Sequence, residues 1–178
     1  MTNNNNMETK KMTTISYFLK QIKENGTTYL TKKNESTIID IAIDLLEKSF
    51  KKEKIILDSA EKVKDYLRLQ LATEEREVFG VIFLDSGLCF LSFEKLFFGT
   101  INKAFVHPRI VVKRALELNA AAVILAHNHP TSSSNISTDD VDITRELKDI
   151  LKVIDVNTLD HIIITKTEAK SSAESGLM

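Results

Sequence analysis

Cysteine, long apolar runs and an excess of charge of either sign are all scarce in this chain of 178 residues. Its single cysteine, Cys89, can form no disulfide within the chain and has no second thiolate with which to bind a metal, which fits a reducing cytoplasm. No apolar run approaches the roughly 18 residues that a membrane-spanning helix needs, and the first residues are too polar for a signal peptide. We therefore expect a cytoplasmic protein that does not enter a membrane.

Basic and acidic residues nearly balance, with 24 Lys and Arg against 25 Asp and Glu. Domains that bind nucleic acid usually carry a basic excess on one face, so the composition does not support nucleic acid as a partner, although it leaves room for a local patch. The densest basic run is interpreted as a solvated helix end. It comprises Lys48, Lys51, Lys52 and Lys54. Apolar residues make up 43% of the chain, which is enough for a packed core.

The first third of the chain is predicted to be accessory to a main domain. Residues 1–12 hold an asparagine tract of low complexity and are expected to be a disordered tail. Residues 13–56 are expected to be a helical extension, because apolar residues recur there at helical spacing. Its expected parts are a helix at 13–25, a polar turn-like segment at 27–35 and a second helix that starts near Thr37.

Strands and helices alternate in the remaining residues, 57–178. The predicted elements, in chain order, are a helix from Asp58 to about Leu71, strands at 78–84 and 88–93 joined by a turn, a helix opened by His107 and Pro108, a strand at 121–126, a polar loop at 130–136, a helix from Ser137 and a strand at 162–164. The polar segment after Lys166 predicts no element. This mixed order favours a layered α/β domain.

One stretch, from His127 to Asp140, gathers residue types that bind metals. Side chains alternate along a strand, so His127 and His129 are expected to point to the same side, where the apolar strand ends. Asp140 lies in the first turn of the next helix, three residues after the capping residue Ser137, and the short loop between can bring that turn back to the strand. Three such ligands leave one tetrahedral position of a zinc ion for water, as in catalytic sites.

Each of these features also has a simpler explanation. Two histidines close together are common in surface loops. Ser137 and Asp140 could form an ordinary capping box, in which the carboxylate only accepts the Ser137 N–H. From the residues alone, the metal site and the simpler explanations stay open.

The spacing of these four residues resembles the JAMM motif, H-x-H-x(7)-S-x-x-D, of the MPN-domain metalloproteases, and it matches at all four positions. From about Leu57 onward the chain also resembles the bacterial RadC family. The similar stretches begin at Arg76, Phe83, Gly99, Val106, Ala120 and Leu159. The resemblance implies an α/β fold in which an MPN (JAMM)-like mixed sheet is flanked by helices, here with a helical N-terminal extension.

The chain departs from that family in two places. Thr131-Ser132 and Ile136-Ser137 stand where RadC relatives usually have Ser-Gly and Pro-Ser, which affects the expected substrate fit more than metal binding. Longer RadC proteins carry an N-terminal helix-hairpin-helix domain. Residues 1–55 do not resemble it, so the chain looks like a short form.

The resemblance implies roles for five residues. His127, His129 and Asp140 would bind zinc, and Ser137 would donate a hydrogen bond to the oxyanion of the attacked carbonyl. Glu77 would activate the water, because Glu77-Val-Phe-Gly-Val-Ile is similar to the first strand of MPN enzymes. Zinc and a carboxylate base together suit hydrolysis at neutral pH. Glu94 is the rival candidate for the base.

Four further residues are expected to be structural. Asp160 and His161 resemble a catalytic pair, but neighbours in a strand point to opposite faces; contact with a metal ligand is the alternative for His161. His107 is expected to start a helix, and Cys89 to be a small buried apolar group in a hairpin strand.

The activity implied by the resemblance is zinc-dependent hydrolysis of an amide bond in a peptide or protein substrate, with peptide or isopeptide linkage left open. One alternative is a DNA-repair or mobile-element accessory protein that binds nucleic acid or a protein partner. Another is a site that holds zinc without turnover.

Overall fold

The computed structural model describes residues 32–52, 60–99, 105–130, 136–166 and 168–178. The chain divides into two compact units, Met1–Leu45 and Leu46–Met178. Helix α2 (Lys32–Lys52) spans that division. The expected helix at 13–25 and the asparagine tract lie outside the described residues. None of the described helices is long and apolar enough to cross a membrane.

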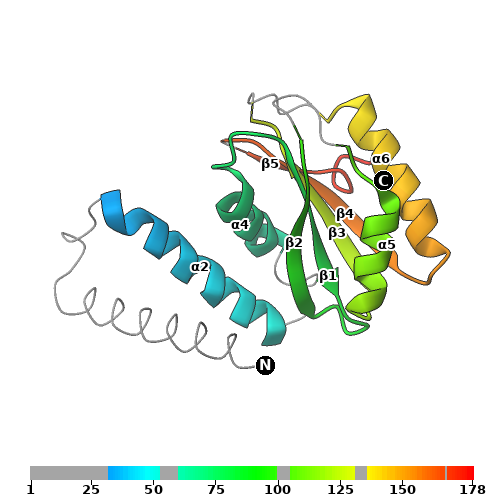
Figure 1. Ribbon diagram of the computed structural model, residues 1–178, viewed down its shortest axis with the longest axis horizontal. Coiled ribbons are helices and arrows are strands. Elements are labelled where there is room, and N and C mark those ends of the chain that lie inside the picture. The colour runs from blue at the N-terminus through cyan, green and yellow to red at the C-terminus, as the bar shows by residue number, and fades with distance from the viewer. Residues whose placement is uncertain (1–31, 53–59, 100–104, 131–135, 167) are drawn as a thin grey trace. The chain divides into compact units, whose positions relative to one another are not determined.

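A five-stranded mixed sheet forms the centre of the second unit (Figure 1). Its strands are β1 (Val78–Leu84), β2 (Phe90–Phe98), β3 (Ala122–Asn128), β4 (Asn157–Ile164) and β5 (Ala169–Ser171), in the spatial order β2-β1-β3-β4-β5. β3 and β4 run parallel, whereas the other neighbours are antiparallel. Parallel strands need a long crossover, and α6 (Thr138–Lys152) supplies it.

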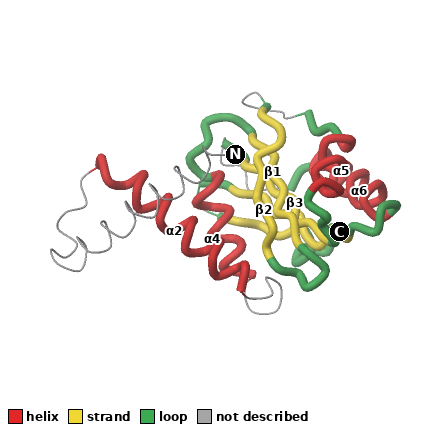
Figure 2. The backbone as a smooth tube through the Cα atoms, turned by 60° about the horizontal axis from the view of Figure 1, so that its bottom comes forward, coloured by secondary structure: helices red, strands yellow, loops and turns green. Residues whose placement is uncertain are grey.

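Helices cover both faces of the sheet (Figure 2). α4 (Ala60–Leu71) packs against one face, while α5 (Pro108–Glu117) and α6 pack against each other over the opposite face. β1 and β3 are buried along their whole length, as expected for central strands covered on both sides. The expected α/β fold, a mixed sheet flanked by helices, is confirmed.

Alternation along the strands divides the core between the two faces. The α5/α6 side is apolar and continuous, and it includes Phe79, Val81, Phe83, Val111, Ala115, Val123, Leu125, Leu147 and Leu151. On the α4 side the buried Tyr66 ring meets Phe90 and Phe93 edge-on, and its hydroxyl donates to Glu47 over 2.8 Å. His127 follows Val123 and Leu125 by even steps, so it lies at the end of the α5/α6 core.

Several predicted boundaries were wrong. α2 already includes residues 32–35, which were expected to be turn-like; the lysines and glutamate there are good helix formers, so the helix starts before the cap-like Thr37. β2 runs to Phe98 rather than 93, with irregular pairing to β1. Cys89 lies half-buried in the turn before β2, not in a strand.

The sequence after Lys166 indicated no element, and the structure places β5 there. Three residues are too few to show a strand period in the sequence. The strand is instead held by pairing of its main chain with β4. β4 itself begins at Asn157, earlier than the predicted 162. The prediction missed its first half because that half is mostly polar and less buried than the second.

Candidate metal centre

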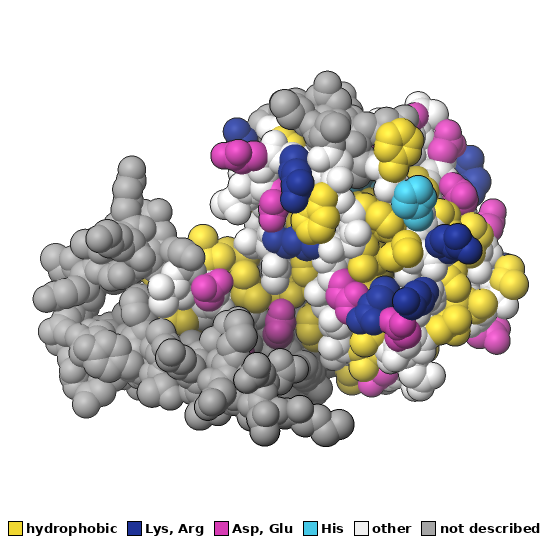
Figure 3. All heavy atoms as spheres, viewed as in Figure 1, with side chains coloured by type: hydrophobic (Ala, Val, Ile, Leu, Met, Phe, Trp, Pro, Cys, Tyr) yellow, Lys and Arg dark blue, Asp and Glu magenta, His cyan; other side chains and the backbone are white. Residues whose placement is uncertain are grey.

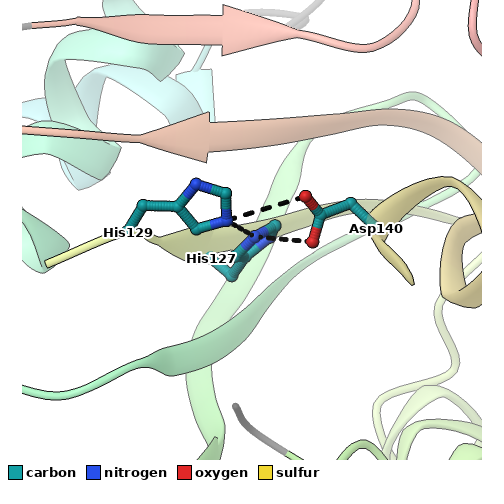
Figure 4. Close-up of side chains that lie close together, drawn as sticks. All are labelled: His127, His129 and Asp140. Atoms are coloured by element: carbon teal, nitrogen blue, oxygen red, sulfur yellow. Dashed lines mark hydrogen bonds and ion pairs between the residues drawn. The ribbon is translucent and has the colours of Figure 1, made fainter. Parts of the chain in front are cut away.

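The two histidines converge at the end of β3. His127 is the next-to-last residue of the strand and is only 6% exposed. His129 follows the strand, and its N–H donates to the Ile164 carbonyl over 2.8 Å, which keeps the chain beside β4. Both rings therefore lie on the same side, as predicted, with their Nε2 atoms 2.8 Å apart (Figure 4).

Asp140 reaches the same point from α6. Its Oδ2 accepts the Ser137 N–H over 2.7 Å, while its own N–H donates to Ser137 Oγ over 3.1 Å, so the two residues form a complete capping box. The same carboxylate lies 3.1 Å from His127 Nε2 and 3.6 Å from His129 Nε2. Capping and approach to the histidines are therefore not alternatives, because one side chain does both.

The arrangement fits a small cation with tetrahedral ligands. One ligand atom from each of His127, His129 and Asp140 lies within 4.8 Å of the others. Around zinc, with bonds of about 2.0–2.1 Å, neighbouring ligand atoms are about 3.3 Å apart. The distances between these side chains, 2.8–3.6 Å, fall on both sides of that value. Two imidazoles with one carboxylate are also a donor set typical of zinc.

The electrostatics favour an ionised Asp140. Burial raises the pKa of its carboxyl, but hydrogen bonds from His127 and His129, and then from Ser137, outweigh burial and hold that pKa well below its usual value. A carboxylate binds a metal in its ionised form.

A third histidine lies behind the first. His161, with no exposed surface, places Nε2 2.8 Å from His127 Nδ1 and Nδ1 2.5 Å from Thr144 Oγ1. Burial, followed by the neighbouring His127, lowers the pKa of His161 well below its ordinary value. His161 was expected to be structural; the structure instead favours the alternative, contact with a metal-binding candidate.

Asp160, its neighbour in the chain, points to the opposite face, as predicted. It accepts hydrogen bonds from Ser171 Oγ over 2.6 Å and from the Ala173 N–H over 3.0 Å. These bonds tie β4 to β5 and to the turn that follows. Asp160 and His161 are therefore not a catalytic pair.

The candidate bases lie in different surroundings. Glu77 is half-buried directly before β1 and is not a member of the three-residue group. Its carbonyl accepts the Gly99 N–H over 2.8 Å, and the next N–H, of Val78, donates to Asn128 Oδ1 over 2.7 Å. Glu94 lies within β2 and forms a two-pronged ion pair with Arg114 of α5. That ion pair is a structural role.

Sequence reasoning did not single out Asn128 and Thr144. Asn128 stands between the two histidines and faces the other way, where its Nδ2 donates to the carbonyls of Glu74 and Arg76. Thr144 lies one helical turn after Asp140, and that spacing was the only sign of its position. His107, by contrast, is the residue before the first turn of α5, as predicted.

Comparison with known proteins agrees with the fold. The profile described as RadC-like JAB domain matches residues 57–177. A UPF0758 protein of Methylibium petroleiphilum is 52% identical over 69% of this chain and 55% of its own length. A UPF0758 protein of Pseudomonas syringae pv. tomato is 49% identical over 68% of this chain and 54% of its own. The chain spans little more than half the length of these curated relatives. On the match over residues 57–177, the chain belongs to the RadC-like JAB domain family.

Proposed function

We propose that this protein is a zinc-dependent hydrolase that cleaves an amide bond, peptide or isopeptide. The observation that carries the proposal is the convergence of two imidazole nitrogens and one carboxylate oxygen within 4.8 Å at a sheet end. Three protein ligands leave one zinc position for water or substrate, which distinguishes catalytic from structural zinc sites. Bound zinc would polarise the scissile carbonyl and acidify a water.

Two other residues would complete the reaction. β1 and β3 pair Phe79 with His127, so continuing that register by two residues puts Glu77 opposite His129. From there its carboxylate would take the proton of the attacking water and pass it to the leaving amine. Ser137 Oγ accepts the Asp140 N–H, which leaves its O–H to donate to the developing oxyanion.

Metal content tests the proposal directly. The protein, purified without a histidine tag, is expected to hold one zinc per chain by mass spectrometry. Asp140→Asn should lose most of it, because a neutral amide is a poor zinc ligand. Asp142→Asn is the matched control on the same helix: this exposed carboxylate contacts Arg145 over 3.6 Å, and its loss should leave zinc unchanged. Absence of zinc from the wild type, or equal zinc in both variants, would contradict the site.

The alternative of nucleic-acid binding gains no support from the face shown in Figure 3. On the face shown in Figure 3, basic and acidic side chains of the described residues are interspersed rather than gathered into a basic patch. Binding through phosphates requires such a patch and weakens steeply with salt. A DNA titration at two salt concentrations would reveal that alternative function if it exists.

A further inference from the structure

We propose that Thr144 and His161 are positioning residues. Their hydrogen bonds hold the proton of the His127 ring on Nδ1, so that Nε2 faces the metal site without a proton. This inference rests on the proposed function, because it assigns His127 Nε2 as a ligand. It gives a role to the one buried histidine that the proposed reaction does not use.

The Thr144 hydroxyl has one hydrogen and two hydrogen-bond partners. Its Oγ1 lies 2.5 Å from the Asp140 carbonyl oxygen and 2.5 Å from His161 Nδ1. A carbonyl oxygen can only accept a hydrogen bond. The hydroxyl therefore donates to Asp140, and its oxygen must accept the N–H of His161 Nδ1.

The next hydrogen bond joins His161 of β4 to His127 of β3. A neutral imidazole carries one N–H, so with the proton on Nδ1 the Nε2 of His161 has a lone pair. That atom lies 2.8 Å from His127 Nδ1, and one proton must lie between them. It belongs to His127 Nδ1, which leaves His127 Nε2 bare toward His129 and Asp140.

The opposite proton order would disable the ligand. If the hydroxyl donated to His161 Nδ1, that ring would carry its proton on Nε2 and donate to His127 Nδ1. His127 would then carry its own proton on Nε2, the atom that faces Asp140 over 3.1 Å. A protonated imidazole nitrogen cannot bind a metal. The Asp140 carbonyl thus selects the binding tautomer of His127, two residues away along the hydrogen-bond chain.

Packing holds the chain of bonds in place. Because no surface of His161 is exposed, water cannot replace either of its partners. The His127 ring also stacks on Phe79, with the planes 11° apart. Asp140 contacts both ends of this series of hydrogen bonds, because its carboxylate faces His127 Nε2 and its carbonyl accepts the Thr144 hydroxyl. The two ligands are therefore fixed relative to each other on two sides.

The test removes the hydroxyl and keeps the shape of the side chain. Thr144→Val can neither donate to Asp140 nor accept from His161, so zinc affinity, measured by competition with a chelator dye, should fall about 10–100-fold. Thr144→Ser restores the hydroxyl and should bind zinc nearly as tightly as the wild type. Thr158→Val is the control on β4: its buried hydroxyl has no hydrogen-bond partner among the described residues, and its loss should leave zinc affinity unchanged.

A second measurement reads the protons themselves. Nitrogen-15 NMR of the imidazole rings distinguishes Nδ1–H from Nε2–H, with or without metal. We expect Nδ1–H at His161 in the wild type and in Thr144→Ser, and a population of Nε2–H in Thr144→Val. Nε2–H at His161 in the wild type would overturn the proposal, as would equal zinc affinity in Thr144→Val and the wild type. If the wild type bound no zinc, the proposed function would be contradicted. The position of the proton on His161, measured by NMR, would still test the proposed order of hydrogen bonds.

Discussion

Asp140 shows how much a single side chain can do at a helix start. Its carboxylate closes the capping box with Ser137 and faces both histidines, while its carbonyl receives the Thr144 hydroxyl. A cap of this kind typically stabilises a helix by about 1 kcal/mol. A buried carboxylate without partners is costly, so the cap and the histidines together allow Asp140 to stay buried and charged. The position of this candidate ligand and the start of α6 are therefore fixed by the same bonds.

Glu77 is the residue whose role is tested by activity. Glu77→Gln keeps the size and the hydrogen-bonding capacity of the side chain but removes the basic oxygen. The variant should fold, hold zinc normally and lose roughly 100-fold or more in turnover. Turnover would be followed with a peptide and isopeptide library as the source of substrate.

Glu94→Gln is the comparison for that experiment. Glu94 is paired with Arg114, so its replacement should weaken the contact between β2 and α5 and lower the unfolding temperature slightly, with turnover retained. Full activity in Glu77→Gln together with loss in Glu94→Gln would reverse the assignment of the base. The three-residue metal site would stand in either case.

At the scale of elements, β1 and β3 could be predicted, whereas β5 and the first half of β4 could not. β1 and β3 are covered by helices on both faces, and their unbroken apolar runs predict buried strands. β5 has three residues, and half of β4 is polar, so neither has a period that a sequence reveals. Their positions depend on main-chain pairing and on bonds such as Asp160 to Ser171.

The candidate site, too, could be predicted only in part from the sequence. His127, His129 and Asp140 could be found because their spacing along the chain is fixed by one strand, one loop and one helical turn. His161 could not be placed against them, because it comes from another strand, and only the parallel pairing of β3 and β4 brings it beside His127. Thr144 shows only the common spacing of one helical turn after Asp140, which many threonines share without any such bond.

Gly80 tests how tightly the β1–β2 pair is packed against α4. A Cβ added to this glycine would lie 2.7 Å from two carbons of the Phe93 ring, which is itself in edge-on contact with Tyr66. Gly80→Ala should therefore lower the free energy of unfolding by about 1–3 kcal/mol, the usual cost of overpacking. Urea unfolding would measure the difference.

A double variant decides whether the ring is the cause. Phe93→Leu removes the obstructing carbons, so Gly80→Ala should cost less in that background than in the wild type. An equal cost in both backgrounds would mean that the strain arises elsewhere, such as at the Glu94 carbonyl 3.3 Å away.

At the scale of the whole molecule, the candidate site and the sheet belong to one unit. The metal-binding candidates, the five strands and helices α4 to α6 all lie within Leu46–Met178. The family match covers nearly the same part, residues 57–177. The contacts described for the candidate site therefore all come from residues of the second unit.

Removal of residues 1–35 puts that independence to the test. The shortened chain, 36–178, keeps Glu47, which accepts the hydroxyl of the buried Tyr66. It should show the same cooperative unfolding transition and the same zinc content as the full chain, measured by circular dichroism and mass spectrometry. A deeper deletion to residue 56 removes Glu47 and with it this hydrogen bond, which should cost about 0.5–1.5 kcal/mol of unfolding free energy without loss of zinc. Loss of the cooperative transition in 36–178 would show instead that the first residues complete the core, because every contact of the sheet described above is retained in that fragment.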